Sequence, residues 1–133
     1  MIVVDTNTIA YFWIRGIYTK FAENLLKKDS EWIAPFLWRS EFRNVLAGYI
    51  RKNLLTLEEA EKLINSAEEQ FKGKEYLVAS ELVMDLVVSS NCSAYDCEYV
   101  ALAKDFNSKL ITSDKKILRE FPMIAIPLKK FTN

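Results

Sequence analysis

The chain has 133 residues, half of them hydrophobic, a length that suffices for one sizeable core but not for two ordinary domains. We therefore expect a single domain over residues 1–133. Its eighteen basic and eighteen acidic side chains cancel, and it has two cysteines and no histidine. This composition argues against a global electrostatic field for polyanions, a zinc site and a disulfide framework.

The sequence predicts no secretory or membrane-spanning segment. The amino terminus enters an apolar run directly, without the basic region of a signal peptide. The longest apolar region, residues 76–88, is interrupted by Glu81 and Asp85 and is too short to cross a bilayer. We therefore expect a cytoplasmic protein that does not bind membranes.

Short strands and helices alternate along the chain. Ile2, Val3 and Val4 are apolar and β-branched without alternation, which is typical of a strand covered on both faces. Further strands are predicted at residues 32–34, 76–78, 110–112 and 124–126. Helices are predicted at residues 9–14, 18–28, 36–52, 56–73, 80–89, 93–106 and 115–120. The alternation predicts an α/β fold whose mainly parallel sheet of four to five strands has helices on both faces.

Two aspartates directly follow predicted strands. Asp5 comes after the first strand, and Asp114 comes shortly after the strand at residues 110–112. The carboxyl ends of parallel strands form the edge of a sheet where ligands bind. Alternatively, each aspartate caps the helix that follows it. The sequence leaves both interpretations open.

Two further acids lie on predicted helices. Glu41 shares a helix face with apolar residues and has no basic residue three or four positions away, so it needs a partner from elsewhere in the fold, or a metal. The alternative is a glutamate at the rim that reaches water. Asp96 lies in a first helical turn, where its spacing from Ser93 also fits a capping box.

Together these four acids predict a metal-dependent hydrolase. Asp5, Glu41, Asp96 and Asp114 can meet in one crevice of a parallel sheet, where their charges would repel one another unless divalent cations lay between them. Oxygen ligands without histidine select Mg²⁺ or Mn²⁺. Such ions bind phosphates and activate water, which indicates hydrolysis of phosphodiester bonds.

Four motifs, in chain order and over nearly the whole chain, resemble those of a PIN domain, most closely the small VapC-type toxins of toxin–antitoxin pairs. They are Asp5-Thr6-Asn7, Glu41 in Ser40-Glu41-Phe42, Asp96 in the run 93–103, and Asp114 after Leu110-Ile111-Thr112-Ser113.

This resemblance implies a three-layer α/β/α sandwich and a Mg²⁺- or Mn²⁺-dependent endoribonuclease that uses one or two ions. Asp5 and Asp96 would be the main ligands, while Glu41 and Asp114 would bind a second ion or position water. Many relatives carry a further acid just beyond the position of Asp114, where this chain has lysines. The hydroxyls and amide that would orient a ligand or water are those of Thr6, Asn7, Thr112 and Ser113.

RNA and protein partners are also predicted. Four basic residues that flank the acids are candidates for binding RNA phosphates, or are solvated surface charges: Arg39, Arg43, Lys115 and Lys116. Four aromatic residues are candidates for stacking on bases, although such residues are more often core or interface: Trp13, Trp38, Tyr95 and Tyr99. The aromatic clusters at residues 11–13 and 36–38 predict a homodimer. The resemblance adds a groove for an apolar segment of a cognate antitoxin.

Two other classes of protein share features with this sequence. A PIN fold that only binds a partner would retain the same elements without activity. A phosphoaspartyl-type phosphatase or receiver-like domain also begins with a strand that ends in aspartate, but such phosphatases usually need a second acid where this chain has Asn7. No Gly-rich phosphate loop is present, so no nucleotide cofactor is predicted.

Overall fold

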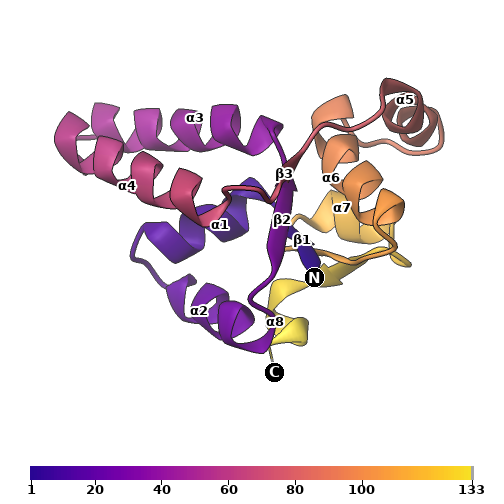
Figure 1. The fold of residues 1–133 in the computed structure, drawn as a ribbon, viewed down its shortest axis with the longest axis horizontal. Helices are drawn as coiled ribbons and strands as arrows, with labels where there is room; N and C mark the ends of the chain where they lie inside the picture. Colours follow the sequence, from indigo (N-terminus) through magenta and orange to yellow (C-terminus); the bar gives the residue numbers. More distant parts are fainter. Residues whose placement is uncertain (133) are drawn as a thin grey trace.

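The computed structural model describes residues 1–132 and places a parallel sheet of five strands between two layers of helices (Figure 1). The strands pair in the order β3-β2-β1-β4-β5. They are β1 (Ile2–Val4), β2 (Trp32–Pro35), β3 (Glu75–Tyr76), β4 (Leu110–Thr112) and β5 (Ala125–Pro127). This arrangement confirms the predicted α/β class and the three-layer α/β/α sandwich.

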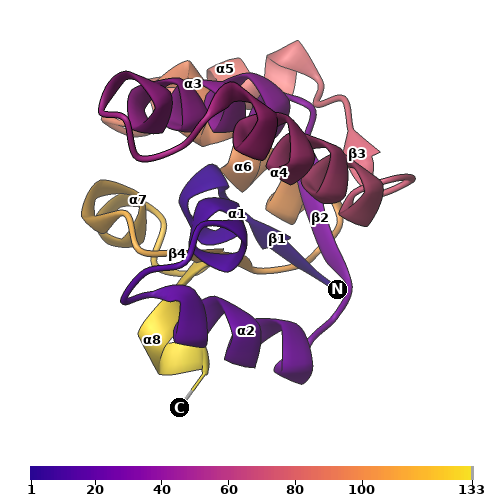
Figure 2. The same ribbon diagram turned by 90° about the vertical axis from the view of Figure 1, so that its left-hand side faces the viewer.

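Helices lie on both sides of the sheet. The first side has α1 (Thr6–Trp13), α2 (Thr19–Lys28), α3 (Leu37–Arg51) and α4 (Leu57–Gln70), on the left in Figure 1. The other side has α5 (Ser80–Val88), α6 (Ala94–Asp105) and α7 (Lys115–Glu120). A last turn, α8 (Leu128–Phe131), packs beside α2, as the rotated view also shows (Figure 2). Within the described residues, no helix is long and apolar enough to span a bilayer.

The central strand β1 determines where the strand order reverses. Its three residues are buried, as expected for a strand covered on both faces. From β1 the chain builds β2 and β3 on one side, then returns to add β4 and β5 on the other. Val4 is level with Ile111 of β4, so the next residue, Asp5, lies beside Thr112. A crevice forms outside the carboxyl ends of the strands at such a reversal.

Two differences from the predicted elements have physical reasons. The strand predicted at residues 76–78 ends at Tyr76. Its partner β2 ends at Pro35, and after Phe36, whose amide donates to the Tyr76 carbonyl at 3.2 Å, the chain turns into α3. Leu77 accordingly turns outward and is 86% exposed. Helix α8 is not among the predicted elements, because a helix of one turn is too short for a periodic pattern.

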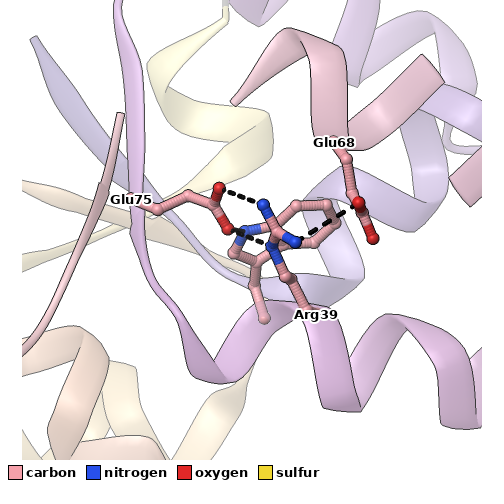
Figure 3. Close-up of polar contacts among 4 residues, drawn as sticks. Arg39, Glu68 and Glu75 are labelled. Carbon is pink, nitrogen blue, oxygen red and sulfur yellow. Dashed lines mark hydrogen bonds and ion pairs between the residues drawn. The ribbon is translucent and has the colours of Figure 1, made fainter. Parts of the chain in front are cut away.

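An ion-pair network ties α3 and α4 to the edge strand β3 (Figure 3). The Arg39 guanidinium donates to both carboxylate oxygens of Glu75, from Nε at 2.6 Å and from Nη2 at 2.7 Å. Its Nη1 donates to Glu68 on α4 at 3.3 Å, and the Trp38 indole donates to Glu75 at 2.8 Å. Arg39 is thus engaged within the fold, and it anchors the helix that carries Glu41.

We expect Glu75→Gln to lower the free energy of unfolding by about 1–3 kcal/mol, because one partner of a largely buried, charged hydrogen-bond network is lost. Urea unfolding followed by circular dichroism measures this change. Glu58→Gln is the control, since Glu58 forms only an exposed pair with Lys62 at 3.7 Å. Equal stabilities for the two variants would contradict this role of the network.

Candidate active site

All four predicted acids line one cleft of about 420 Å³ at the carboxyl ends of β1 and β4. They come from four different parts of the chain and converge only in the folded protein. The polar lining consists of Asp5, Thr6, Asn7, Ser40, Glu41, Asn44, Tyr95, Asp96, Tyr99 and Asp114. Ser40 and Asn44 were not predicted. Asn44 lies three residues after Glu41 on α3, so helical spacing from Glu41 would have identified it, whereas Ser40 precedes Glu41 directly.

Asp5 is buried, with 7% of its surface exposed, and its carboxylate accepts three hydrogen bonds. Oδ1 accepts from the Thr8 amide at 3.0 Å and from the Thr8 hydroxyl at 2.8 Å, which caps α1. Oδ2 accepts from the Thr112 hydroxyl. Burial raises the pKa of Asp5, and nearby Asp114 adds to the shift, while the hydrogen bonds oppose it. Asp5 therefore caps a helix and also lines the cleft.

Thr112 connects the ends of the two neighbouring strands. Its buried hydroxyl donates to Asp5 and accepts from the Asp114 amide at 3.0 Å. Asp114 in turn caps α7 by accepting from the Ile117 amide at 2.9 Å. The predicted orienting hydroxyl of Thr112 thus acts through the two aspartates rather than at the cleft surface. Ser113 is exposed and does not line the cleft.

Glu41 finds its partners on two other helices. Its Oε1 accepts from the Thr6 hydroxyl at 2.9 Å and from the Tyr99 hydroxyl at 2.6 Å, and these two hydroxyls lie 2.7 Å apart. Tyr99 is only 3% exposed, and burial followed by the charge of Glu41 raises its pKa. Its ring is therefore unavailable for stacking on a base.

The contact between Tyr99 and Glu41 is not among the sequence predictions, although two features of the sequence indicate it. A buried tyrosine usually needs a hydrogen-bond partner for its hydroxyl. Tyr99 also lies three residues after Asp96, so the two share a helix face and the same cleft.

Asp96 is half-buried in the first turn of α6, where its amide donates to the Ser93 hydroxyl at 3.0 Å. Burial raises the pKa of Asp96, and the charge of Asp114 adds to the shift, while Ser93 and Lys116 oppose it. The charge of Asp114 thus acts on both Asp5 and Asp96. Asp96 is part of the acidic cleft as well as of the helix terminus.

Of the four basic residues predicted as candidate RNA contacts, one is held within the fold and three are exposed. Arg39 is held by Glu75 and Glu68 and does not line the cleft. Arg43, Lys115 and Lys116 are exposed, and among these Lys116 acts electrostatically on Asp96.

Three of the four candidate stacking residues are engaged within the fold, and the fourth is exposed. Trp38 is buried, Tyr99 bonds Glu41, and the Trp13 indole donates to Gln70 at 2.8 Å. Tyr95 lines the cleft and is 63% exposed, so its ring is accessible.

The chemistry of the cleft fits a hard divalent cation. Its lining offers carboxylate, hydroxyl and amide oxygens, and neither cysteine lines it. Within residues 1–132, no three acidic, cysteine or histidine side chains are grouped closely enough to enclose an ion. Mg²⁺ does not need such a cage, because it keeps several waters and binds proteins through one or two carboxylates.

Known proteins are similar to this chain in sequence and in fold. The PIN domain family model matches residues 2–122. The chain therefore belongs to the PIN domain family. It is 29% identical to Ribonuclease VapC3 of Pyrobaculum aerophilum over 129 residues, covering 95% of this chain and 98% of that protein.

Solved structures show the same fold. PAE2754 from Pyrobaculum aerophilum is 18% identical with a TM-score of 0.77, covering 98% of this PIN domain chain and 92% of that chain. FitAcB from Neisseria gonorrhoeae is 17% identical with a TM-score of 0.76, covering 97% of this chain and 99% of that chain.

In metal-free protein, we expect Asp96→Asn to gain stability relative to wild type as the pH rises above 3.8, the ordinary pKa of aspartate. A raised pKa means that the folded state binds the proton more tightly than the unfolded state. This contribution is fully present below the ordinary pKa and is lost as the pH rises through the raised one.

Urea unfolding of both proteins in EDTA, from about pH 4 to about pH 8, measures this difference. Asp105→Asn is the control, because Asp105 is exposed at the end of the same helix. A stability difference between wild type and Asp96→Asn that does not change with pH would remove Asp96 from the electrostatic cluster.

Proposed function

We propose that this PIN domain is an endoribonuclease that depends on Mg²⁺ or Mn²⁺ and hydrolyses RNA phosphodiester bonds. The observation that carries the proposal is the single cleft lined by Asp5, Glu41, Asp96 and Asp114, at the reversal of strand order. Membership of the PIN family and the likeness to a protein named Ribonuclease VapC3 support the same activity. The VapC-type resemblance extends the proposal to the toxin of a toxin–antitoxin pair.

The acids would hold one or two ions. Asp5 and Asp96 are the proposed main ligands, and Glu41 and Asp114 would bind a second ion or contact it through water. When bound, the ion would lower the pKa of a coordinated water and stabilise charge that develops on the phosphate. Asp5 can contribute through Oδ2, which accepts one hydrogen bond, whereas Oδ1 accepts two.

Other residues would orient Glu41 and the substrate. Thr6 and Tyr99 both hold Oε1 of Glu41, which leaves Oε2 to accept a proton from the attacking water. Asn7 is exposed where it lines the cleft, and its amide can donate to a phosphate oxygen. The exposed ammonium of Lys116 acts on Asp96 and can bind a neighbouring phosphate.

A phosphoaspartyl mechanism has less support than a metal-dependent one. Its nucleophile would be Asp5, but such phosphatases usually have a second acid two residues further on, where this chain has Asn7. The second alternative, a PIN fold that only binds a partner, is tested by the activity assay.

We expect purified protein to cleave single-stranded or structured RNA in Mg²⁺ or Mn²⁺ and to stop in EDTA. Glu41→Gln should lower the rate by about 100-fold or more, since it removes a proton acceptor in the cleft. The measurement is cleavage of a labelled RNA under single-turnover conditions.

Glu58→Gln is the control, because it neutralises an exposed glutamate on α4 outside the cleft. Cleavage that survives EDTA, or that persists in Glu41→Gln, would contradict the proposed mechanism. Absence of any cleavage would favour the binding module.

We also propose a cognate antitoxin as a partner. A groove of about 630 Å³ lies between the ends of α1 and α3 and the start of α4, and most of its lining is apolar. Trp13, Ile14, Leu54, Leu55 and Leu63 contribute to it. This composition and position support the docking of an apolar segment of the antitoxin.

A separate apolar surface supports a homodimer. Phe36, Leu77, Met84 and Val88 are exposed near β3 and α5, and three of them line a small shared pocket with Glu98. Exposed apolar side chains gathered in this way are typical of protein interfaces.

Light scattering tests the homodimer. The protein alone should have the mass of two 15.4 kDa chains, and Leu77→Asp should shift the mass to that of one chain. A wild-type protein that stays monomeric at high concentration would contradict the homodimer.

Light scattering also tests the antitoxin groove. When the protein is expressed with the product of an adjacent small open reading frame, a heavier complex should form, and Leu54→Asp should weaken this complex. A complex that stays intact with Leu54→Asp would contradict the groove.

A further inference from the structure

A row of aromatic rings ending in a lysine extends over α1, α2 and α8. We call Tyr11, Tyr18, Phe21 and Lys129 the aromatic–lysine strip. The ring centroids of Tyr11 and Tyr18 are 4.9 Å apart, and those of Tyr18 and Phe21 are 6.3 Å apart. The Lys129 ammonium lies 5.4 Å from the Tyr18 ring and 5.6 Å from the Phe21 ring. The strip is thus a continuous set of contacts between three elements.

The strip begins beside the acidic cleft. A groove of about 270 Å³ is lined by Tyr11 and Tyr18, and it shares Asn7 and Val45 with the cleft. Burial raises the pKa of Tyr11, and the charge of Asp5 adds to the shift. A ligand can therefore lie in the cleft and on the strip at the same time.

The position of Lys129 is determined by packing. Leu128 is buried beside α2, and Lys28 of α2 donates to the carbonyl of Phe131 while lying 4.7 Å from its ring. Figures 1 and 2 both show α8 against α2. The short helix α8 is therefore held at both ends, and Lys129 projects from it over the rings.

Lys129 has no carboxylate partner among the described residues, so its ammonium can bind an anion. Lys129, its neighbour Lys130 on α8 and Lys20 on α2 are exposed, and none of them is among the ion pairs of the described part of the chain. The nearby Glu23 pairs with Arg15 at 3.2 Å. Because the net charge of the whole chain is zero, attraction of a polyanion depends on such a local group of cations.

The aromatic rings of the strip lie beside a lysine ammonium that has no carboxylate partner within residues 1–132, a combination that matches the chemistry of single-stranded nucleic acid. Its unstacked bases can stack on aromatic side chains, and its phosphates bind lysine. Tyr11 and Tyr18 are only partly buried, so part of each side chain is accessible to a ligand. A duplex keeps its bases stacked on one another and would gain little from the rings.

We propose that the aromatic–lysine strip binds a single-stranded segment of the RNA next to the bond that is cleaved. Tyr11 and Tyr18 stack on bases, and Lys129 binds a phosphate. This proposal rests on the proposed ribonuclease activity, since the strip adjoins that cleft and serves the same substrate.

The test is binding of a fluorescent single-stranded oligoribonucleotide in EDTA, measured by anisotropy over a range of salt concentrations. Tyr18→Leu should weaken binding about tenfold, while Tyr18→Phe retains it because the ring remains. Lys129→Gln should weaken binding several-fold and make the slope of log affinity against log salt less negative by about 0.7. Lys104→Gln, an exposed lysine on α6 across the sheet, should bind like wild type.

The binding results distinguish a failure of the strip proposal from a failure of the proposed ribonuclease activity. Unchanged affinity in both Tyr18→Leu and Lys129→Gln, or equal binding of duplex RNA, would overturn the strip even if wild type cleaves RNA. Weakened binding in these variants supports the strip even if wild type fails to cleave, in which case only the nuclease proposal falls. Lys129→Gln changes an exposed side chain, so the test does not depend on whether Tyr18→Leu folds.

Discussion

The buried carboxylate of Asp5 is the interaction on which the rest of the site depends. A carboxylate with 7% exposure needs hydrogen-bond donors, and here they come from Thr8 on α1 and Thr112 on β4. These bonds set where α1 begins and hold the end of β4 against the end of β1. Because Thr112 also accepts from the Asp114 amide, the same contact positions the second aspartate. The central strand therefore organises the cleft through one side chain.

Helix termini partly compensate the negative charge of the cleft. Asp5 caps α1, Asp114 caps α7, and Asp96 lies in the first turn of α6. The amino end of a helix carries a partial positive charge, and each of these three acids lies at such an end. The interpretations of helix cap and site acid are therefore compatible. Burial is the main cause of the raised pKa values of Asp5 and Asp96, and the charge of Asp114 adds to both shifts, so the helix ends do not cancel the mutual repulsion of the acids.

Helix α3 is held by side chains at two neighbouring positions that point in different directions. Arg39 bonds Glu75 on the edge strand, and Glu41 accepts hydroxyl donors from Thr6 and Tyr99 on the opposite side of the helix. The first contact anchors the helix to the sheet, and the second sets the orientation of its carboxylate. A glutamate side chain with one oxygen held in this way has little freedom to leave the cleft, which preorganises it for a substrate.

The sequence by itself determined the elements with strong local patterns. The apolar run of β1, the capping box of Thr56 and Glu59, and the acids after β1 and β4 were all predictable, because each depends on residues that are neighbours along the chain. Asp5 and Asp114 could be assigned to one crevice, because parallel strands end at a common edge. Glu41 and Asp96 could be added to it, because each is an acid near the beginning of a predicted helix.

Only the tertiary structure decided which partner each side chain has. Arg39 is a candidate RNA contact or a solvated surface charge by sequence, but it bonds Glu75, which is distant in sequence. Tyr99 is a candidate for base stacking or for the core, and it is buried and bonds Glu41. Likewise, Lys129 acquires its place over Tyr18 and Phe21 only when α8 packs on α2. Helical periodicity gives the face on which a residue lies, whereas the group that meets this face is set by the packing of elements far apart along the chain.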